Sequence, residues 1–197
     1  MTVSLMKAMK FSIQFMWMVW EGIFDFLTKF RSESIWRFGI CKLVVKKYNG
    51  KGVILKNGQQ IVAGEWIGEL HLDNSQVLKL TRTVGADQAG LSIARMLQHA
   101  MVQMASEIDN QSELKKVQAL MGITLLRRGL THGLGFEQHP IESKWQQRII
   151  TVYLRMLLRV LHPEGNKRIQ RNKKKLTPCM LVISSSSLKE RFLLNKQ

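Results

Sequence analysis

The chain has 197 residues, of which 45% are hydrophobic and 22% are charged. This size and composition are typical of one globular domain that forms a core without metal or disulfide bonds. Thirty Lys and Arg residues outnumber fourteen Asp and Glu residues, so the formal net charge is +16. Such a charge favours anionic partners, whether a phospholipid surface, an anionic polymer or nucleic acid. The only cysteines, Cys41 and Cys179, exclude a disulfide framework or a zinc motif and favour reduced thiols in the cytoplasm.

Residues 1–32 predict an aromatic, amphipathic helix ahead of the main domain, residues 33–197. Residues 11–20 (FSIQFMWMVW) are mostly apolar and follow two lysines. The stretch is shorter than the roughly 20 residues that span a bilayer, and Glu21 follows it without a cleavage site. Three interpretations stay open: a helix packed on the core, a helix in the membrane interface, and a secretion signal. The second would place the protein peripherally at the inner membrane face.

The region after this segment predicts β-structure. Residues 35–48 are rich in β-branched and aromatic types, which favours a strand. Further strands are expected at 53–55 and 66–73, with turns at 49–52 and at Asn57-Gly58, a pair preferred by type I′ hairpins. These strands predict an antiparallel meander.

The rest of the chain predicts mainly helices. They are expected at 74–81, 87–108, 114–121, 122–130, 144–161 and 184–192. A short strand is expected at 136–141, a loop at 167–175 and a buried strand at 179–183. The predicted fold class is therefore α+β, with an antiparallel β-meander packed with several helices in a single domain.

The string Gly68-Glu-Leu-His-Leu-Asp-Asn74 is the most unusual local feature. On a strand Glu69, His71 and Asp73 share one face. A carboxylate beside an imidazole fixes its tautomer and favours its charged form, so the three residues are candidate catalytic groups. The alternative is structural: Asp73 caps the next helix and Glu69 pairs with a lysine. No His or Cys spacing predicts a metal site, and no cofactor is expected.

The positive charge is concentrated between residues 144 and 175, which hold ten basic residues and one acid, Glu164. The candidate anion-binding residues are Arg155, Arg159, Lys167, Arg168, Arg171, Lys173, Lys174 and Lys175. A run of this kind is either a solvated surface or a binding surface. Residues 167–175 contain no aromatic side chain, so the indication of nucleic-acid binding is unspecific.

Three parts of the sequence together resemble the uncharacterised bacterial YkoP-like family. They are Trp20–Asp25 with the following Lys47–Lys51, the string Gly68–Asn74, and Leu134–Phe136 with the downstream Leu161–Gly165 and the final strand. The resemblance implies a small protein of sporulating bacteria, or a domain fused to polysaccharide deacetylases, and hence a role near the cell envelope. It implies no catalytic residues. A basic residue expected after the last strand is replaced here by the serines of Ser184–Ser187.

Three functions follow as hypotheses. The first is a non-catalytic binding or accessory domain for an anionic cell-envelope polymer or a membrane surface. The second is an enzyme of envelope polysaccharide or lipid metabolism that uses Glu69, His71 and Asp73. The third is nucleic-acid binding through residues 167–175, which would weaken steeply with salt.

Overall fold

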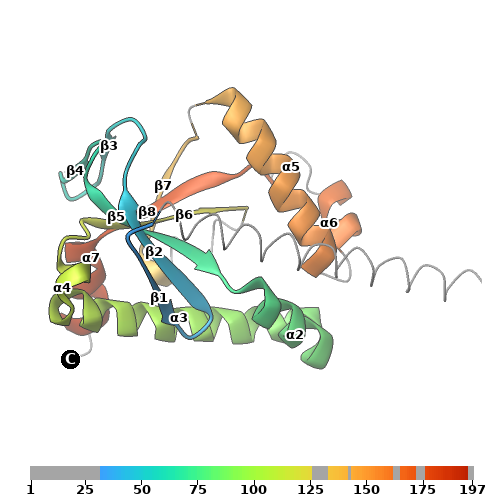
Figure 1. The fold of residues 1–197 in the computed structure, drawn as a ribbon. Coiled ribbons are helices and arrows are strands. Elements are labelled where there is room, and N and C mark those ends of the chain that lie inside the picture. Colours follow the sequence, from blue (N-terminus) through green and yellow to red (C-terminus); the bar gives the residue numbers. More distant parts are fainter. Residues whose placement is uncertain (1–31, 126–132, 142, 162–164, 172–175, 195–197) are drawn as a thin grey trace, which may run out of the picture.

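A computed structural model describes residues 32–125, 133–141, 143–161, 165–171 and 176–194. A six-stranded sheet lies at its centre, in the order β1-β2-β5-β6-β8-β7 (Figure 1). Its strands are β1 (Ser34–Phe38), β2 (Cys41–Lys47), β5 (Trp66–Leu72), β6 (Ala119–Thr124), β8 (Cys179–Ser184) and β7 (Glu137–His139). All neighbouring strands are antiparallel except β5 and β6, which are parallel.

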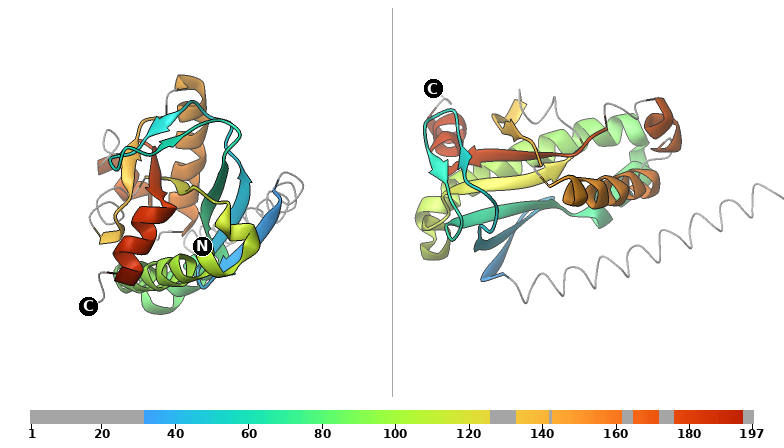
Figure 2. Two further views of the ribbon diagram at one scale, coloured as in Figure 1. Left: turned by 90° about the vertical axis from the view of Figure 1, so that its left-hand side faces the viewer. Right: turned by 90° about the horizontal axis from the view of Figure 1, so that it is seen from above.

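The parallel pair requires a crossover connection, which three helices supply. The helices of the described region are α2 (Asn74–Val84), α3 (Ala86–Asn110), α4 (Ser112–Lys115), α5 (Lys144–Leu161), α6 (Gly165–Arg171), α7 (Ser185–Lys189) and the π-helical turn η2 (Glu190–Leu194). The long helix α3 runs along one face of the sheet, and α5 rises on the other side with α6 beside it (Figures 1 and 2). The expected α+β class is confirmed.

The main core lies between the sheet and α3. Side chains alternate along each strand, so one face of the sheet presents apolar residues such as Leu43, Leu120 and Ile183 to this helix. The facing side of α3 supplies Met101 and Met104, both fully buried. The apolar side expected for the helix at 87–108 is therefore the side that packs on the sheet.

A small hairpin covers part of the opposite face. Its strands are β3 (Val53–Ile54) and β4 (Gln60–Ile61), and its buried Leu55 packs in a second cluster with Met121 and Val182. The tight turn predicted at Asn57-Gly58 is present, but it is not the type I′ turn that this pair prefers. Among Asn57 and Gly58 only Gly58 has a positive φ, at 82°, and its amide donates to the Leu55 carbonyl at 2.9 Å, so Asn57 does not need the left-handed conformation.

Two further predictions are wrong. The helix expected from 114 to 130 ends at Lys115, and residues 119–124 form the central strand β6. A short apolar run buried on both faces of a sheet cannot be distinguished from a helix by periodicity. The loop expected at 167–175 is helical as far as Arg171, because α6 buries Ile169. The predicted N-terminal helix and Lys173–Lys175 lie outside the described residues.

Candidate functional site

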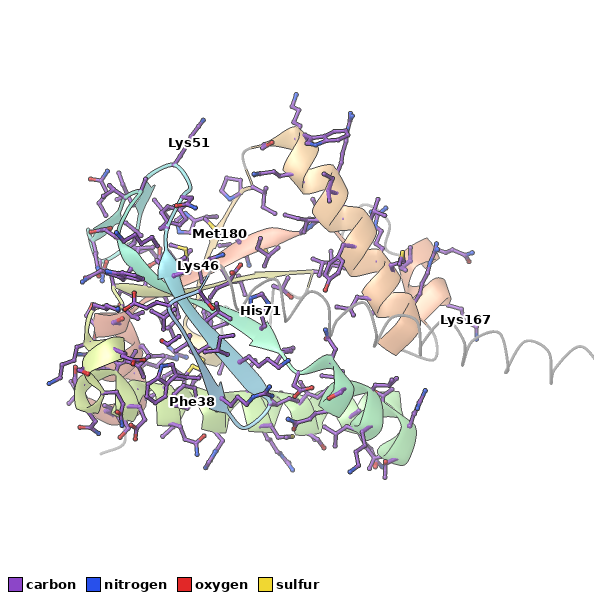
Figure 3. All side chains as sticks on the ribbon, viewed as in Figure 1. Phe38, Lys46, Lys51, His71, Lys167 and Met180 are labelled. Carbon is purple, nitrogen blue, oxygen red and sulfur yellow. The ribbon has the colours of Figure 1, made fainter. Side chains whose placement is uncertain are left out.

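Strand β5 carries two of the three predicted site residues on the sheet face opposite α3. Gly68 precedes them on the strand and packs closely against the core, since a Cβ at this position would lie 2.5 Å from Leu43 Cδ1. Glu69 and His71 project the other way, and both are half-buried. The Glu69 carboxylate forms an ion pair with Lys46 and lies 3.5 Å from Nε2 of His71. Lys46 and His71 lie on adjacent strands at the centre of the sheet (Figure 3).

Asp73 has a different role from its two neighbours. It precedes α2, and its carboxylate accepts hydrogen bonds from the backbone amides of Ser75 at 3.1 Å and Gln76 at 3.3 Å. This is the geometry of a helix N-cap. The structure therefore brings Glu69 and His71 together, whereas the Asp73 carboxylate is engaged in the cap.

The groups around Glu69 stabilise its ionised form. Burial raises the pKa of Glu69, but hydrogen bonds and Coulomb attraction from His71 and Lys46 outweigh this effect and lower the pKa to about 2. Glu69 is therefore ionised at neutral pH, with Nε2 of the His71 imidazole 3.5 Å from its carboxylate.

A second Glu–x–His pair, which was not among the predicted site residues, lies on β7. Glu137 and His139 have the same two-residue spacing as Glu69 and His71, and Nε2 of His139 lies 3.8 Å from the Glu137 carboxylate. The repeated spacing on a predicted strand was the available signal. Both oxygens of Glu137 also accept the backbone amide of Lys56, at 3.0 and 2.9 Å, which ties the hairpin to β7.

The register places both pairs on one face of the sheet. Glu69 is opposite Met121, Met121 is opposite Val182, and Val182 is opposite Glu137. One row of the sheet thus carries two glutamates, with the apolar Met121 and Val182 between them. Three strand spacings of about 4.8 Å separate the carboxylates by about 14 Å, so the two pairs do not form one reaction centre.

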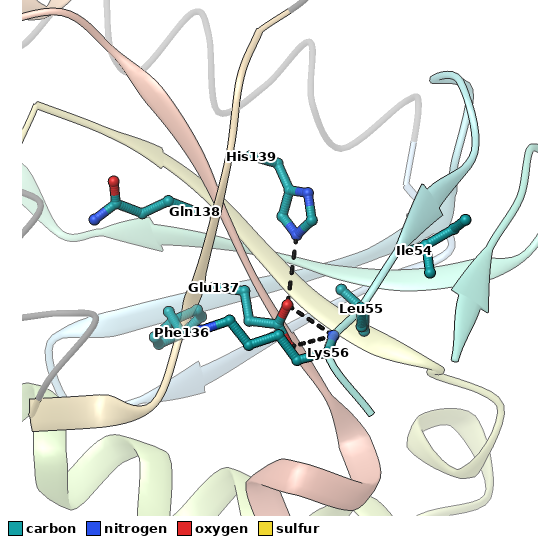
Figure 4. Close-up of a pocket in the computed structure, with 7 residues that line it drawn as sticks. All are labelled: Ile54, Leu55, Lys56, Phe136, Glu137, Gln138 and His139. Atoms are coloured by element: carbon teal, nitrogen blue, oxygen red, sulfur yellow. Dashed lines mark hydrogen bonds and ion pairs between the residues drawn. The ribbon is translucent and has the colours of Figure 1, made fainter. Parts of the chain in front are cut away.

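One cavity adjoins the second pair. It has a volume of about 630 Å³ and is shown in Figure 4. Its lining residues are Ile54, Leu55, Lys56, Phe136, Glu137, Gln138 and His139. A smaller cavity, of about 250 Å³, lies beside Ser187 and Arg191. Neither cavity is lined by Glu69, His71 or Asp73.

The described side chains do not assemble a metal centre. Within the described part of the chain, no group of three or more His, Cys, Asp or Glu side chains could hold an ion. Nε2 of His71 and Nε2 of His139 are buried, and each has one carboxylate beside it, at 3.5 and 3.8 Å. Two ligands are fewer than a structural or catalytic zinc site uses.

The predicted anion-binding residues fall on α5, α6 and the segment that follows. Arg159 and Lys167 are exposed, and Arg155 is half-buried with its guanidinium donating to the Leu176 carbonyl at 3.4 Å. The backbones of Arg168 and Arg171 belong to α6. Lys144 and Arg148 add exposed charge to α5, which contains no acidic residue. Helix α6 and its Lys167 lie beside α5, away from the Glu69–His71 pair (Figure 3).

Comparison with known proteins identifies the family of this chain. The fold is that of an α+β protein with two Glu–x–His pairs on one face of its sheet, and no solved structure matches the chain. The YkoP domain matches residues 10–192. The chain is 24% identical over 122 residues to the uncharacterized protein YkoP of Bacillus subtilis (strain 168), which covers 61% of this chain and 66% of that relative. The chain belongs to the YkoP domain family.

No helix in the described ranges combines the length and the hydrophobicity that a bilayer span requires.

Proposed function

We propose that this protein is a non-catalytic binding domain for an anionic component of the cell envelope. The observation that supports this proposal is the positive charge of the adjacent helices α5 and α6. We call the basic residues of these two helices the basic surface. Helix α5 has four basic residues and no acid over eighteen positions, and α6 adds Lys167, Arg168 and Arg171. Positive charge concentrated on adjacent helices attracts a polyanion more strongly than the same charge spread over the surface.

The close packing of the two helices keeps this charge together. Gly165 begins α6 against the backbone of α5, where a Cβ would overlap the Leu158 carbonyl oxygen. Only glycine allows this approach without displacement of the α5 backbone. The basic surface therefore behaves as one unit for a partner with closely spaced negative groups.

The test is salt-dependent binding of the full chain to inorganic polyphosphate and to vesicles of phosphatidylglycerol. The variant carries Lys144→Glu, Arg148→Glu and Arg159→Glu. A matched control carries Lys79→Glu, Arg95→Glu and Lys115→Glu, which are exposed residues on α2, α3 and α4 with the same change in charge. The proposal expects the first variant to lose binding to both probes and the control to keep most of it.

Two results would contradict the proposal. One is equal loss of binding in both variants, which would indicate a net-charge effect without a defined surface. The other is wild-type affinity that does not change with salt, because counterion exchange makes charge-driven association salt-dependent. A duplex DNA probe in the same series addresses nucleic-acid binding: preference for DNA over both other probes would favour that alternative.

Acid–base catalysis on an envelope polysaccharide or lipid is the second candidate, supported by the ionised Glu69 beside His71. It is tested by incubating the protein with N-acetylglucosamine oligomers and with phospholipid vesicles, and analysing the products by mass spectrometry. This candidate expects conversion by the wild type and none by His71→Gln. If Asp73→Asn forms as much product as the wild type, the activity depends on the Glu69–His71 pair and not on the capping residue. Absence of any product with the wild type would count against catalysis.

A further inference from the structure

Helix α5 has a large apolar strip on its solvent side. Trp145, Ile149, Val152 and Met156 are 69%, 53%, 65% and 45% exposed. They follow one another at intervals of four, three and four residues, so they form one continuous line along the helix. We call these four residues the apolar ridge. Contiguous exposed apolar side chains of this size mark interaction surfaces, whereas scattered ones do not.

Basic residues lie along one edge of the apolar ridge. At about 100° per residue, Lys144, Arg148, Arg155 and Arg159 occupy an arc of about 60° of the helix, and the ridge occupies the adjoining 60° or so. Lys144, Arg148 and Arg159 are exposed, and no acidic side chain interrupts either arc. The solvent side of α5 is therefore divided lengthwise into a cationic half and an apolar half.

The other side of the helix explains why the ridge is available. Ile150, Tyr153, Leu154, Leu157 and Leu158 are half-buried, and α5 makes its main contacts with α6 and α2. The protein thus already uses one apolar side of α5 for packing. The ridge is a second apolar side that nothing in the described part of the chain covers.

We propose that α5 lies in the interface of an anionic phospholipid bilayer, with the apolar ridge among the acyl chains and its basic residues at the headgroup phosphates. The inference rests on the proposed function and narrows the anionic partner to a lipid bilayer. A soluble polyanion engages the charges and leaves the ridge in water. A bilayer engages both halves of the exposed side at once, because its interface presents phosphate and hydrocarbon at neighbouring depths. Trp145 marks the contact, since indole rings concentrate at that interface.

The deciding variant is Ile149→Ser, Val152→Ser and Met156→Ser, which removes three ridge residues and keeps every charge. Its control is Ile54→Ser, Val62→Ser and Leu91→Ser, at residues that are 67%, 41% and 58% exposed elsewhere on the molecule. Binding is measured by co-sedimentation with vesicles of phosphatidylglycerol and phosphatidylcholine, and separately with polyphosphate. Circular dichroism melting checks that each variant is folded.

The expected result is a loss of at least about tenfold in vesicle affinity for the ridge variant. The serines forgo the free energy gained when three apolar side chains are buried in the bilayer, and even partial burial of three such side chains contributes that much. Its binding to polyphosphate stays within about twofold of the wild type, and the control variant binds both probes normally. Brominated lipid quenches the Trp145 contribution to emission, taken as the difference between the wild type and Trp145→Phe. Unchanged vesicle binding by the ridge variant, or no quenching, would overturn the inference.

The two proposals fail in different ways. Wild-type binding to polyphosphate without binding to anionic vesicles would refute insertion and leave the basic surface as a polyanion site. Binding to neither probe would refute both. Vesicle binding that survives loss of the ridge but not loss of the basic residues would place the protein on the membrane by charge alone.

Discussion

Glu69 and Glu137 lie in one row of the sheet, on the same face, with Met121 and Val182 between them. Each glutamate is followed two residues later by a histidine whose Nε2 faces its carboxylate. The partners differ, because Glu69 pairs with Lys46 and Glu137 accepts the Lys56 backbone amide. One pair is thus held within the sheet and the other fastens the hairpin to it.

Glu69→Gln should make the protein less stable at neutral pH. The pKa of Glu69 is about 2 in the folded protein, below the value of about 4.3 for an unfolded chain. A lowered carboxyl pKa contributes stability above the unfolded value, and this contribution is lost as the pH falls from about 4.5 towards 2. We expect a decrease of about 2 kcal/mol in the free energy of unfolding at pH 7, measured by urea denaturation.

The same difference should be small at pH 2, where about half of the folded wild-type molecules also carry the proton on Glu69. Glu113→Gln serves as the control, because Glu113 is exposed on the short helix α4. A difference between the wild type and Glu69→Gln that stays constant from pH 7 to pH 2 would contradict the electrostatic account.

Asp73→Ala should lower the free energy of unfolding by about 1 kcal/mol, because the first turn of α2 loses its N-cap acceptor. Asp73→Ser should retain most of the stability, since a serine hydroxyl caps a helix in the same way. Thermal melts followed by circular dichroism measure both variants. Equal destabilisation by Ala and Ser would show that the carboxylate acts through something other than the cap.

Glu137→Ala should loosen the hairpin without unfolding the domain. The Lys56 amide loses both carboxylate oxygens, and a hydrogen bond to a charged group contributes about 1.5–3 kcal/mol. Amide hydrogen exchange at Lys56, measured by NMR, should accelerate by at least about tenfold. Exchange at Met101, in the middle of α3, should not change. Acceleration at both positions would indicate global destabilisation.

Cys41 should not react with thiol reagents in the folded protein. Burial raises the pKa of its thiol to about 12, and the thiolate is the reactive form. Cys179 is also buried. Ellman's reagent at pH 8 should therefore detect almost no thiol in the native protein and two per chain in guanidinium chloride. Rapid labelling of a native thiol would contradict the burial of these residues.

Local chemistry explains which parts of the site the sequence could predict. The period of two along β5 puts Glu69 and His71 on one face, and an Asp ahead of a helical segment predicts a cap, as found for Asp73. The alignment of Glu137 with Glu69 depends on two intervening strands. One of them, β6, was predicted as helix because its apolar run carries no strand periodicity. Without that strand, the shared face of the two pairs could not be derived.

The exposure of the apolar ridge is a second feature that could not be predicted from the sequence. Helix α5 is apolar on most sides, which predicts a buried helix when only the sequence is considered. Which sides face solvent depends on how few elements surround it, and that is a property of the tertiary arrangement.

The parallel pairing of β5 with β6 also bears on how the chain folds. Ile67 and Ala119 become neighbours only after the intervening crossover through α2, α3 and α4 has closed, and closing a loop of roughly fifty residues costs chain entropy before any contact repays it. Strands β1, β2 and β5 can pair through comparatively short connections. The pairing of β5 with β6 at the centre of the sheet requires the long crossover to close first. Folding should accordingly be slower than for a helical bundle of this length, because sequence-distant contacts retard the search for the native state.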